Sequence, residues 1–334
     1  MGPSHAEMHL RELLRKRVSP RNFSRVASLA VWAMALTMVS GAAVRLTGSG
    51  LGCADWPTCA NNHVVAPLQF HAWMEFGNRL VVAAVTVAIV AAVAGSLLRS
   101  PRRRDLTGLS LVLVAGVFAQ ILLGGETVLH HLAPQYVMSH FLLSSILLAD
   151  AVVLHHRAAI PDGAASGRRW RAPAGPAVSL VSRGHRVMGR LVLAAAGTVV
   201  VLGSIVTSTG PHGGDPTAPR FAFSLHDVAQ LHGAAVEVLL ALTLLTLWTM
   251  HRAGAPGAVM RRGEIMLLVL VAQAGVGYTQ YFTGDPALLV GIHVAGAASV
   301  VVAVTHFNLG LRAHPTPAPQ PGPRSSGEPA LIAG

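Results

Sequence analysis

The chain has 334 residues, of which 52% are hydrophobic and only 12% are charged. About a quarter of the residues of a soluble globular domain are charged, so the composition excludes that class. The formal net charge of +11 raises the question of a nucleic-acid partner, which the placement of the basic residues decides.

Apolar windows of roughly 20 residues, the length that crosses the hydrocarbon core of a bilayer, recur along the whole sequence. They predict an all-α polytopic membrane protein with eight transmembrane helices. The predicted spans are 26–46, 74–97, 106–126, 136–156, 188–208, 227–250, 264–282 and 287–310.

The basic residues gather on alternate connections between these spans. The basic segments are the N-terminal arm from Arg11 to Arg25, then 99–104, 157–190, 252–262 and the tail with Arg312 and Arg324. This positive-inside asymmetry predicts a multi-pass protein of the cell membrane with both termini in the cytoplasm. Because topology accounts for the charge, a nucleic-acid partner is excluded.

An internal duplication organises the chain. Gly41-Ala-Ala-Val-Arg-Leu-Thr-Gly48 ends the first span and Gly203-Ser-Ile-Val-Thr-Ser-Thr-Gly210 ends the fifth, while Gln120 precedes His140 by the same 20 residues as Gln273 precedes His293. Two four-helix bundles therefore follow one another in the same orientation, as a parallel repeat. The expected organisation is a basic arm (1–25), a first half (26–157), a linker (158–187), a second half (188–310) and a disordered tail (311–334).

Both cysteines, Cys53 and Cys59, lie in the first connection on the outer side. That side is oxidising, so a close pair favours a disulfide. A structural staple and a redox-active pair that exchanges electrons or thiols with a partner both remain open. A metal site is disfavoured, because two sulfurs without nearby histidines make an incomplete ligand set.

Three histidines occupy matched depths near the outer ends of predicted spans: His140, His232 and His293. Neutral imidazole is an axial ligand of heme iron, and a histidine within a bilayer is costly unless it is bonded. A hydrogen bond between helices is the alternative for a lone histidine, but the repeat favours ligation. His232 and His293 are thus expected to hold one heme in the second half.

In the first half, the position matched to His232 is Asn78, which is a poor iron ligand. His71, Glu75 and Asn78 share one helical face, since they are spaced at i, i+4 and i+7. The iron of a second heme would be bound by His140 alone, or by His140 with His71, or with His130 or His131 of the outer loop.

Arg45, Arg79 and Arg220 depart from the charge rule, since they lie at or near the outer side. An arginine in or against the bilayer usually has an anionic partner, so these three are candidates to hold heme propionates. An anchor to lipid headgroups is the alternative. For Glu75, a salt bridge with Arg79 one turn away is the alternative to a catalytic role.

A family resemblance is carried by Val44-Arg-Leu-Thr-Gly-Ser-Gly-Leu-Gly-Cys-Ala-Asp-Trp-Pro57, by Glu75-Phe-Gly-Asn-Arg-Leu80, by Gly203 to Asp215 with its Thr-Gly-Pro-His-Gly-Gly-Asp, and by the histidines near helix starts. Over nearly all of residues 24–310 the chain resembles the bacterial heme A synthases. The resemblance implies oxidation of a methyl group of heme O, through an alcohol, to the formyl group of heme A, with heme b for electron transfer.

By the same resemblance, Glu75 corresponds to an essential glutamate, His232 and His293 to the heme b ligands, and His140 to one ligand of the substrate heme. The other family ligand falls on Asn78, which is a departure from the pattern. The paired loop cysteines of the family correspond to Cys53 and Cys59.

The sequence therefore predicts a two-heme membrane oxidoreductase that acts on heme O. Expected partners are the prenyltransferase that makes heme O and an electron-transfer or thiol-redox protein, and an oligomer is compatible with the pattern. Two other classes remain: an electron-transfer cytochrome b without substrate chemistry, and a multi-pass transporter.

Overall fold

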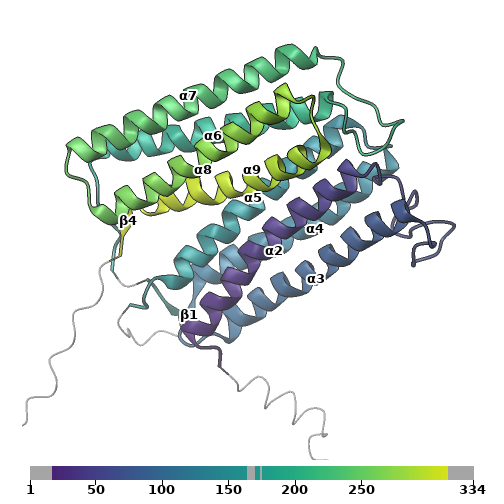
Figure 1. Ribbon diagram of the computed structural model, residues 1–334. Helices are drawn as coiled ribbons and strands as arrows, with labels where there is room; N and C mark the ends of the chain where they lie inside the picture. The colour runs from purple at the N-terminus through teal and green to yellow at the C-terminus, as the bar shows by residue number, and fades with distance from the viewer. Residues whose placement is uncertain (1–16, 164–169, 174, 315–334) are drawn as a thin grey trace, which may run out of the picture.

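The computed structural model describes residues 17–163, 170–173 and 175–314, so most of the basic arm and residues 315–334 of the expected tail lie outside the described residues. Within these described residues, eight long helices run side by side (Figure 1). They are α2 (Pro20–Leu46), α3 (Phe70–Leu98), α4 (Arg104–Leu129), α5 (Pro134–Ala159), α6 (Arg183–Thr209), α7 (Leu225–Arg252), α8 (Gly257–Phe282) and α9 (Ala287–Leu309). Each is long and apolar enough to cross a bilayer, which confirms the eight predicted spans.

Several helices begin at residues that favour helix starts. Ser19 caps α2 by accepting a hydrogen bond from the backbone N–H of Asn22, and Ser182 and Ser224 cap α6 and α7 in the same way. A serine oxygen at this position satisfies one of the backbone donors that the first turn leaves free. Pro134 starts α5, where its missing N–H costs nothing.

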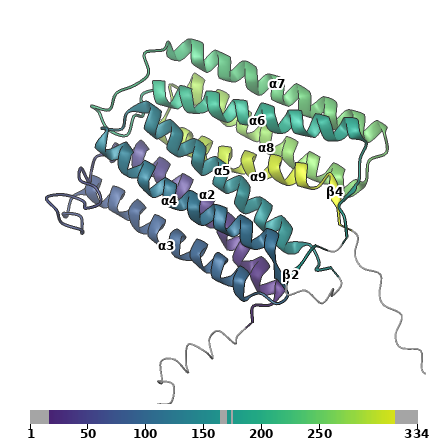
Figure 2. The same ribbon diagram turned by 180° about the vertical axis from the view of Figure 1, so that it is seen from behind.

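The helices form two rings of four. In the first, α3 packs on α2 and α4, and α5 packs on α4 and α2, so α3 and α5 are diagonal partners. In the second, α7 packs on α6 and α8, and α9 packs on α8 and α6, so α7 and α9 are diagonal. The rings meet where α9 packs against α2 and α5, and α3 and α7 lie on opposite flanks of the molecule (Figures 1 and 2).

Two ends of the molecule can be distinguished. The cysteine end carries the connection between α2 and α3, with Cys53 and Cys59, and the connection between α6 and α7. The arginine end carries the basic connections and two short ribbons, in which β1 (Arg102–Arg103) pairs with β2 (Trp170–Arg171) and β3 (Val178–Ser179) pairs with β4 (Arg312–Ala313).

Two arginines at the arginine end are buried within the protein. Arg99 and Arg103 are 2% and 0% exposed. Arg99 forms an ion pair with Asp162 (3.0 Å), and Arg103 forms one with Asp105 (2.6 Å) and donates to the carbonyl of Ile160. A buried guanidinium needs such partners, because an unpaired charge is very costly to desolvate. These contacts hold the segment that follows α3 against the segment that follows α5.

Candidate functional site

The clearest arrangement of functional side chains is the histidine pair of the second ring. His232 of α7 and His293 of α9 face each other with their ring centroids 6.4 Å apart and their planes at 75°. They come from diagonal helices, so the pair spans the inside of the ring. The sequence pattern predicted this pairing of the two residues, and the structure brings them together.

Two glycines make room for these imidazoles. A Cβ atom at Gly203 of α6 would lie 2.9 Å from Cε1 of His232, and one at Gly277 of α8 would lie 2.9 Å from Cε1 of His293. Real Cβ atoms do not approach other atoms this closely without a shift of the neighbour. Each histidine ring is therefore packed directly onto the backbone of the adjacent helix, which restricts its orientation.

The first ring repeats half of this arrangement. His140 of α5 packs against Gly124 of α4, where a Cβ atom would lie 3.3 Å from Cε1 of the imidazole. Its Nδ1 atom, like that of His293, is buried and has no hydrogen-bond partner among the described residues. A buried imidazole nitrogen without a partner is costly, and a bond to a metal would remove that cost.

The position opposite His140 differs from its counterpart. Asn78 of α3 accepts a hydrogen bond from the hydroxyl of Ser40 on α2 (2.8 Å). The adjacent Gly41, which matches Gly203, has no neighbouring atom within 4 Å of where its Cβ would be. The first ring therefore offers an amide and open space where the second ring offers an imidazole packed on glycine.

Of the other histidines considered as ligands, His131 is exposed, and the other two have partners at the cysteine end. His71 is exposed at the start of α3, and its Nδ1 atom lies 2.9 Å from the hydroxyl of Ser49. His130 stacks on Tyr136 with ring centroids 4.3 Å apart, and its Nδ1 atom lies 2.9 Å from the carbonyl of Glu126. The structure gives neither of them a contact with His140.

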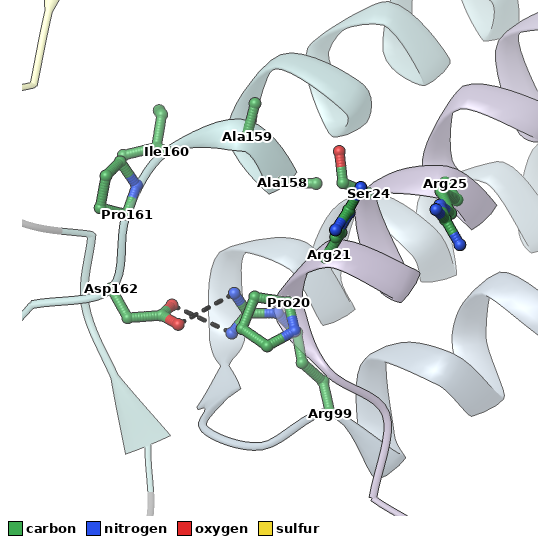
Figure 3. Close-up of a pocket in the computed structure, with 10 residues that line it drawn as sticks. All are labelled: Pro20, Arg21, Ser24, Arg25, Arg99, Ala158, Ala159, Ile160, Pro161 and Asp162. Carbon is green, nitrogen blue, oxygen red and sulfur yellow. Dashed lines mark hydrogen bonds and ion pairs between the residues drawn. The ribbon is translucent and has the colours of Figure 1, made fainter.

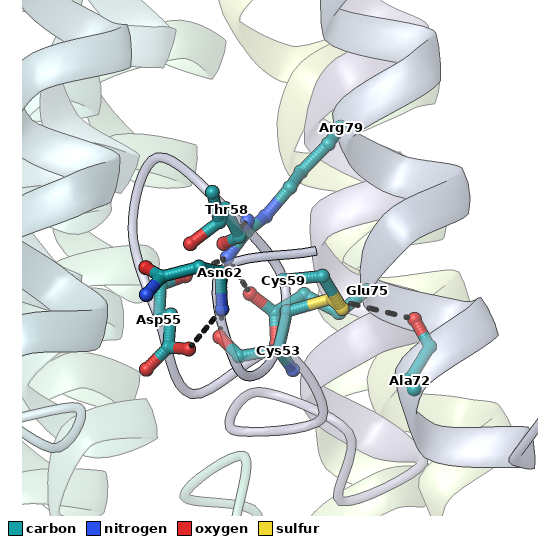
Figure 4. Close-up of a disulfide and its surroundings, with 8 residues drawn as sticks. All are labelled: Cys53, Asp55, Thr58, Cys59, Asn62, Ala72, Glu75 and Arg79. Atoms are coloured by element: carbon teal, nitrogen blue, oxygen red, sulfur yellow. Dashed lines mark hydrogen bonds and ion pairs between the residues drawn. A yellow bond between two sulfur atoms is a disulfide. The ribbon is translucent and has the colours of Figure 1, made fainter. Parts of the chain in front are cut away.

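Cys53 and Cys59 form a disulfide, and both are fully buried (Figure 4). The loop that they close packs onto two helices. Gly52 lies so close to α3 that a Cβ atom there would clash with the carbonyl of His71, and the ring of Trp56 packs directly on Gly125 of α4. The loop thus forms a fixed cover over the cysteine end of the first ring.

Glu75 fastens this loop to α3. It is 6% exposed, and its carboxylate accepts one hydrogen bond from the backbone N–H of Cys53 (2.7 Å) and one from the guanidinium of Arg79 (2.7 Å). The salt bridge between Glu75 and Arg79, one alternative from the sequence, is therefore present. Because the charge lies beneath the disulfide loop, Glu75 has a structural contact in addition to any role in chemistry.

Arg79 reaches over the same loop. Its guanidinium donates to the backbone carbonyls of Thr58 (2.7 Å), Cys53 (3.2 Å) and Asp55 (3.2 Å). Figure 4 shows this side chain extending from α3 toward the loop. We refer to Glu75, Arg79 and the carbonyls and N–H that they bind as the loop clasp.

Arg45 has an equivalent role between the two halves. It lies in the last turn of α2 and donates to the backbone carbonyls of Thr207 (2.6 Å) and His212 in the second half. The backbone N–H of Gly50 also donates to the carbonyl of Gly214 (2.8 Å). Arg220 has no hydrogen bond or ion pair to any residue that the structure describes, and it lies beside Gly213.

Gln120 and Gln273 are landmarks of the sequence repeat, and their contacts were not predicted from it. Gln120 donates to the backbone carbonyl of His140 (3.0 Å), and Gln273 donates to that of His293 (2.8 Å). Their identical spacing to the histidines was the signal that they share one function. Each glutamine fixes the helix that carries a histidine relative to the neighbouring helix.

With this geometry established, a comparison with known families is informative. A family model described as cytochrome oxidase assembly protein (COX15-CtaA) matches residues 62–305. The chain belongs to the heme A synthase family of these proteins. The matched segment contains Glu75, Asn78 and the three matched histidines.

Individual relatives agree with this assignment. The protein named heme A synthase from Shouchella clausii is 24% identical over 282 residues, which are 81% of this chain and 91% of that protein. The heme A synthase from Geobacillus kaustophilus is 34% identical over 113 residues, 34% of this chain and 35% of that protein. The one from Shewanella oneidensis is 30% identical over 140 residues, 36% of this chain and 41% of that protein. The last two matches thus span less than half the length of those relatives.

Proposed function

We propose that the protein is a heme A synthase, which oxidises a methyl group of heme O to the formyl group of heme A through hydroxylated intermediates. Heme b would be held by His232 and His293, and heme O would be bound as substrate in the first ring with His140 as ligand. Bound heme b would supply one-electron redox chemistry.

The separation of His232 and His293 is the observation that carries this proposal. With metal–nitrogen bonds of about 2 Å and about 1 Å from each nitrogen to its ring centroid, two imidazoles whose centroids are about 6 Å apart could both bind one metal ion. The observed separation is 6.4 Å. The unpartnered Nδ1 atom of His293 and the two glycine contacts also fit a ligand pair whose ring orientations are fixed by packing.

The asymmetry between the rings supports different tasks for them. Histidines from both diagonal helices meet in the second ring, which fits a resident heme. In the first ring, Asn78 is hydrogen-bonded to Ser40 and supplies no imidazole opposite His140. A substrate heme must enter and leave its site, and fewer protein ligands to its iron would make this exchange easier. We therefore assign heme O to the first ring.

Glu75 is proposed as the catalytic carboxylate. An ionised carboxylate has about four acceptor positions. Arg79 and the backbone N–H groups of Cys53 and Gly52 occupy three, so one remains to accept a proton from the substrate or to stabilise positive charge that develops on it. The same three contacts hold the carboxylate in one position, which such a role requires.

Arg45 and Arg79 are proposed to bind heme propionates with the N–H groups that their backbone contacts leave free. A guanidinium has five such donors. The backbone carbonyls of Thr207 and His212 take two from Arg45. Arg220 is the third proposed donor, since it has no partner among the described residues and lies at the same end of the molecule as Arg45.

A spectrum of the purified protein tests the proposal. In cells that make heme O, we expect a pyridine hemochrome spectrum with heme b together with heme O or heme A, and loss of heme b in His232→Ala and His293→Ala. His306→Ala is the matched control, because His306 lies on the same helix as His293 at the arginine end. Heme b alone would indicate an electron-transfer cytochrome. Absence of any heme would favour the alternative that the protein is a multi-pass transporter.

A further inference from the structure

A pocket of 580 Å³ lies at the arginine end, remote from the cysteine loop and from the matched histidines. The first two turns of α2 form one wall with Arg21, Ser24 and Arg25 (Figure 3). The end of α5 and the residues after it, 158–162, form the opposite wall together with Arg99. The pocket therefore opens where two helices of the first ring reach the end of the bundle.

The charge of this pocket is positive. Among the lining residues that the structure describes, Asp162 is the only carboxylate, and it is shared by Arg99 (3.0 Å) and Arg103 (3.8 Å). Arg21 and Arg25 form no hydrogen bond or ion pair with any residue that the structure describes. Arg99 is 2% exposed, and its Nε atom is buried without a hydrogen-bond partner in the described chain. The pocket thus has more guanidinium groups than carboxylates to neutralise them.

An apolar stripe continues from the two free arginines along α2. Leu29, Trp32 and Leu36 are 62%, 72% and 54% exposed. With Arg21 and Arg25 they are spaced at i, i+4, i+8, i+11 and i+15, which places all five on one face of the helix. Arg25 and Leu36 are separated by about 16 Å along the helix axis, close to half the thickness of a hydrocarbon core.

We infer that this pocket and stripe bind an anionic phospholipid. Arg21, Arg25 and Ser24 would contact its phosphate, and an acyl chain would lie along Leu29, Trp32 and Leu36. Basic pockets between helices at a membrane surface recognise anionic headgroups in this way. Free phosphate would use the arginines alone, whereas the aligned stripe on the same face fits a ligand with an acyl chain.

The test compares lipid retention by the full-length protein with its hemes. Wild type and variants are solubilised in mild detergent with equal amounts of phosphatidylglycerol and phosphatidylcholine of the same acyl chains, and bound lipid is counted by native mass spectrometry. We expect the wild type to retain phosphatidylglycerol preferentially. The double variant Arg21→Gln, Arg25→Gln should lower this preference about 25-fold, since each arginine near a headgroup is worth about 5-fold.

The matched control is Arg183→Gln, Arg261→Gln. It removes two exposed arginines near the starts of α6 and α8, at the same end of the molecule but away from the pocket. We expect this control to keep the preference for phosphatidylglycerol, with an unchanged heme spectrum in both double variants. An equal loss in the control would show a general charge effect and overturn the proposal.

A third variant tests the apolar part of the site. Trp32→Ser, Leu36→Ser shortens the stripe but leaves the arginines, so retention of phosphatidylglycerol should fall. Soluble glycerophosphoglycerol, which has the headgroup but no acyl chain, should compete poorly with the lipid. Full competition by this soluble compound, or unchanged retention in the stripe variant, would identify a site for free phosphate groups and contradict a lipid site.

Discussion

The side-chain amide of Gln273 donates a hydrogen bond to the backbone carbonyl of His293 across the interface of α8 and α9. Gln120 makes the same bond to His140 between α4 and α5. A backbone carbonyl within a helix normally bonds only to the N–H four residues later, so each glutamine adds a bond that sets the register of one helix against the next. The same bond therefore occurs at both matched histidines, each of which lies on the second helix of its pair.

Replacing Gln273 by leucine should therefore weaken the binding of heme b to the second ring. Loss of one hydrogen bond costs about 1 kcal/mol, so retention of heme b should fall by about 5-fold, with a shifted reduced-minus-oxidised spectrum. Gln120→Leu is the matched control, because it removes the same bond beside His140 and should leave the heme b spectrum unchanged. Equal effects of the two variants on heme b would contradict the assignment of heme b to the second ring.

Adding one methyl group beside the ligand histidines should have a larger effect. Gly203→Ala and Gly277→Ala each place a Cβ atom 2.9 Å from an imidazole carbon. Overpacking of this kind costs about 1–3 kcal/mol, and we expect heme b content to fall by about 10-fold or more. Gly197→Ala in α6 and Gly275→Ala in α8 are the controls, because no atom lies within 4 Å of either Cβ position.

The disulfide should be present in protein isolated without reductant. A disulfide leaves no free thiol, so alkylation of the protein after unfolding without reductant should modify neither cysteine, as read by mass spectrometry. Cys53→Ser, Cys59→Ser should make local opening of the loop about 2 kcal/mol easier, since the bond closes a short loop. Faster hydrogen exchange of the backbone N–H groups of the loop would measure this; exchange at the wild-type rate would show that the loop clasp alone holds the loop.

The sequence was sufficient to predict the eight helices and the histidine pair, because both follow from local signals. Apolar windows mark spans, and the repeated spacing of the histidines predicts that His232 and His293 form a pair. The contacts of Arg45 with Thr207 and His212 could not be predicted, since they join segments more than 160 residues apart through the path of a connection.

The orientation of Glu75 is a second feature that spacing did not determine. Its position on the helical face of His71 and Asn78 was correctly predicted, but periodicity does not describe the loop that folds over that face. The backbone N–H of Cys53 lies where it can donate to the carboxylate. A side chain expected to face only the substrate site therefore also supports a disulfide loop, and the two roles need to be separated experimentally.

Glu75→Ala and Arg79→Ala separate them, because each variant removes one member of the loop clasp but only the first removes a carboxylate. A purely structural role of Glu75 predicts the same outcome for both: a loosened loop, seen as faster hydrogen exchange at Cys53, and a similar fall in heme A.

We expect instead that Glu75→Ala stops heme A formation with heme b retained, whereas Arg79→Ala loosens the loop yet keeps part of the activity. Glu75→Asp withdraws the carboxylate by about 1.5 Å and should be partly active, since position matters to a catalytic group. The measurement is the heme A and heme O content of membranes from cells that make heme O. The catalytic assignment is wrong if Glu75→Ala accumulates heme A at the wild-type level, or if the two alanine variants lose heme A equally with equally loosened loops. Ala229, which matches Glu75 in the second half, carries no acid, so heme b retention has no reason to depend on this carboxylate.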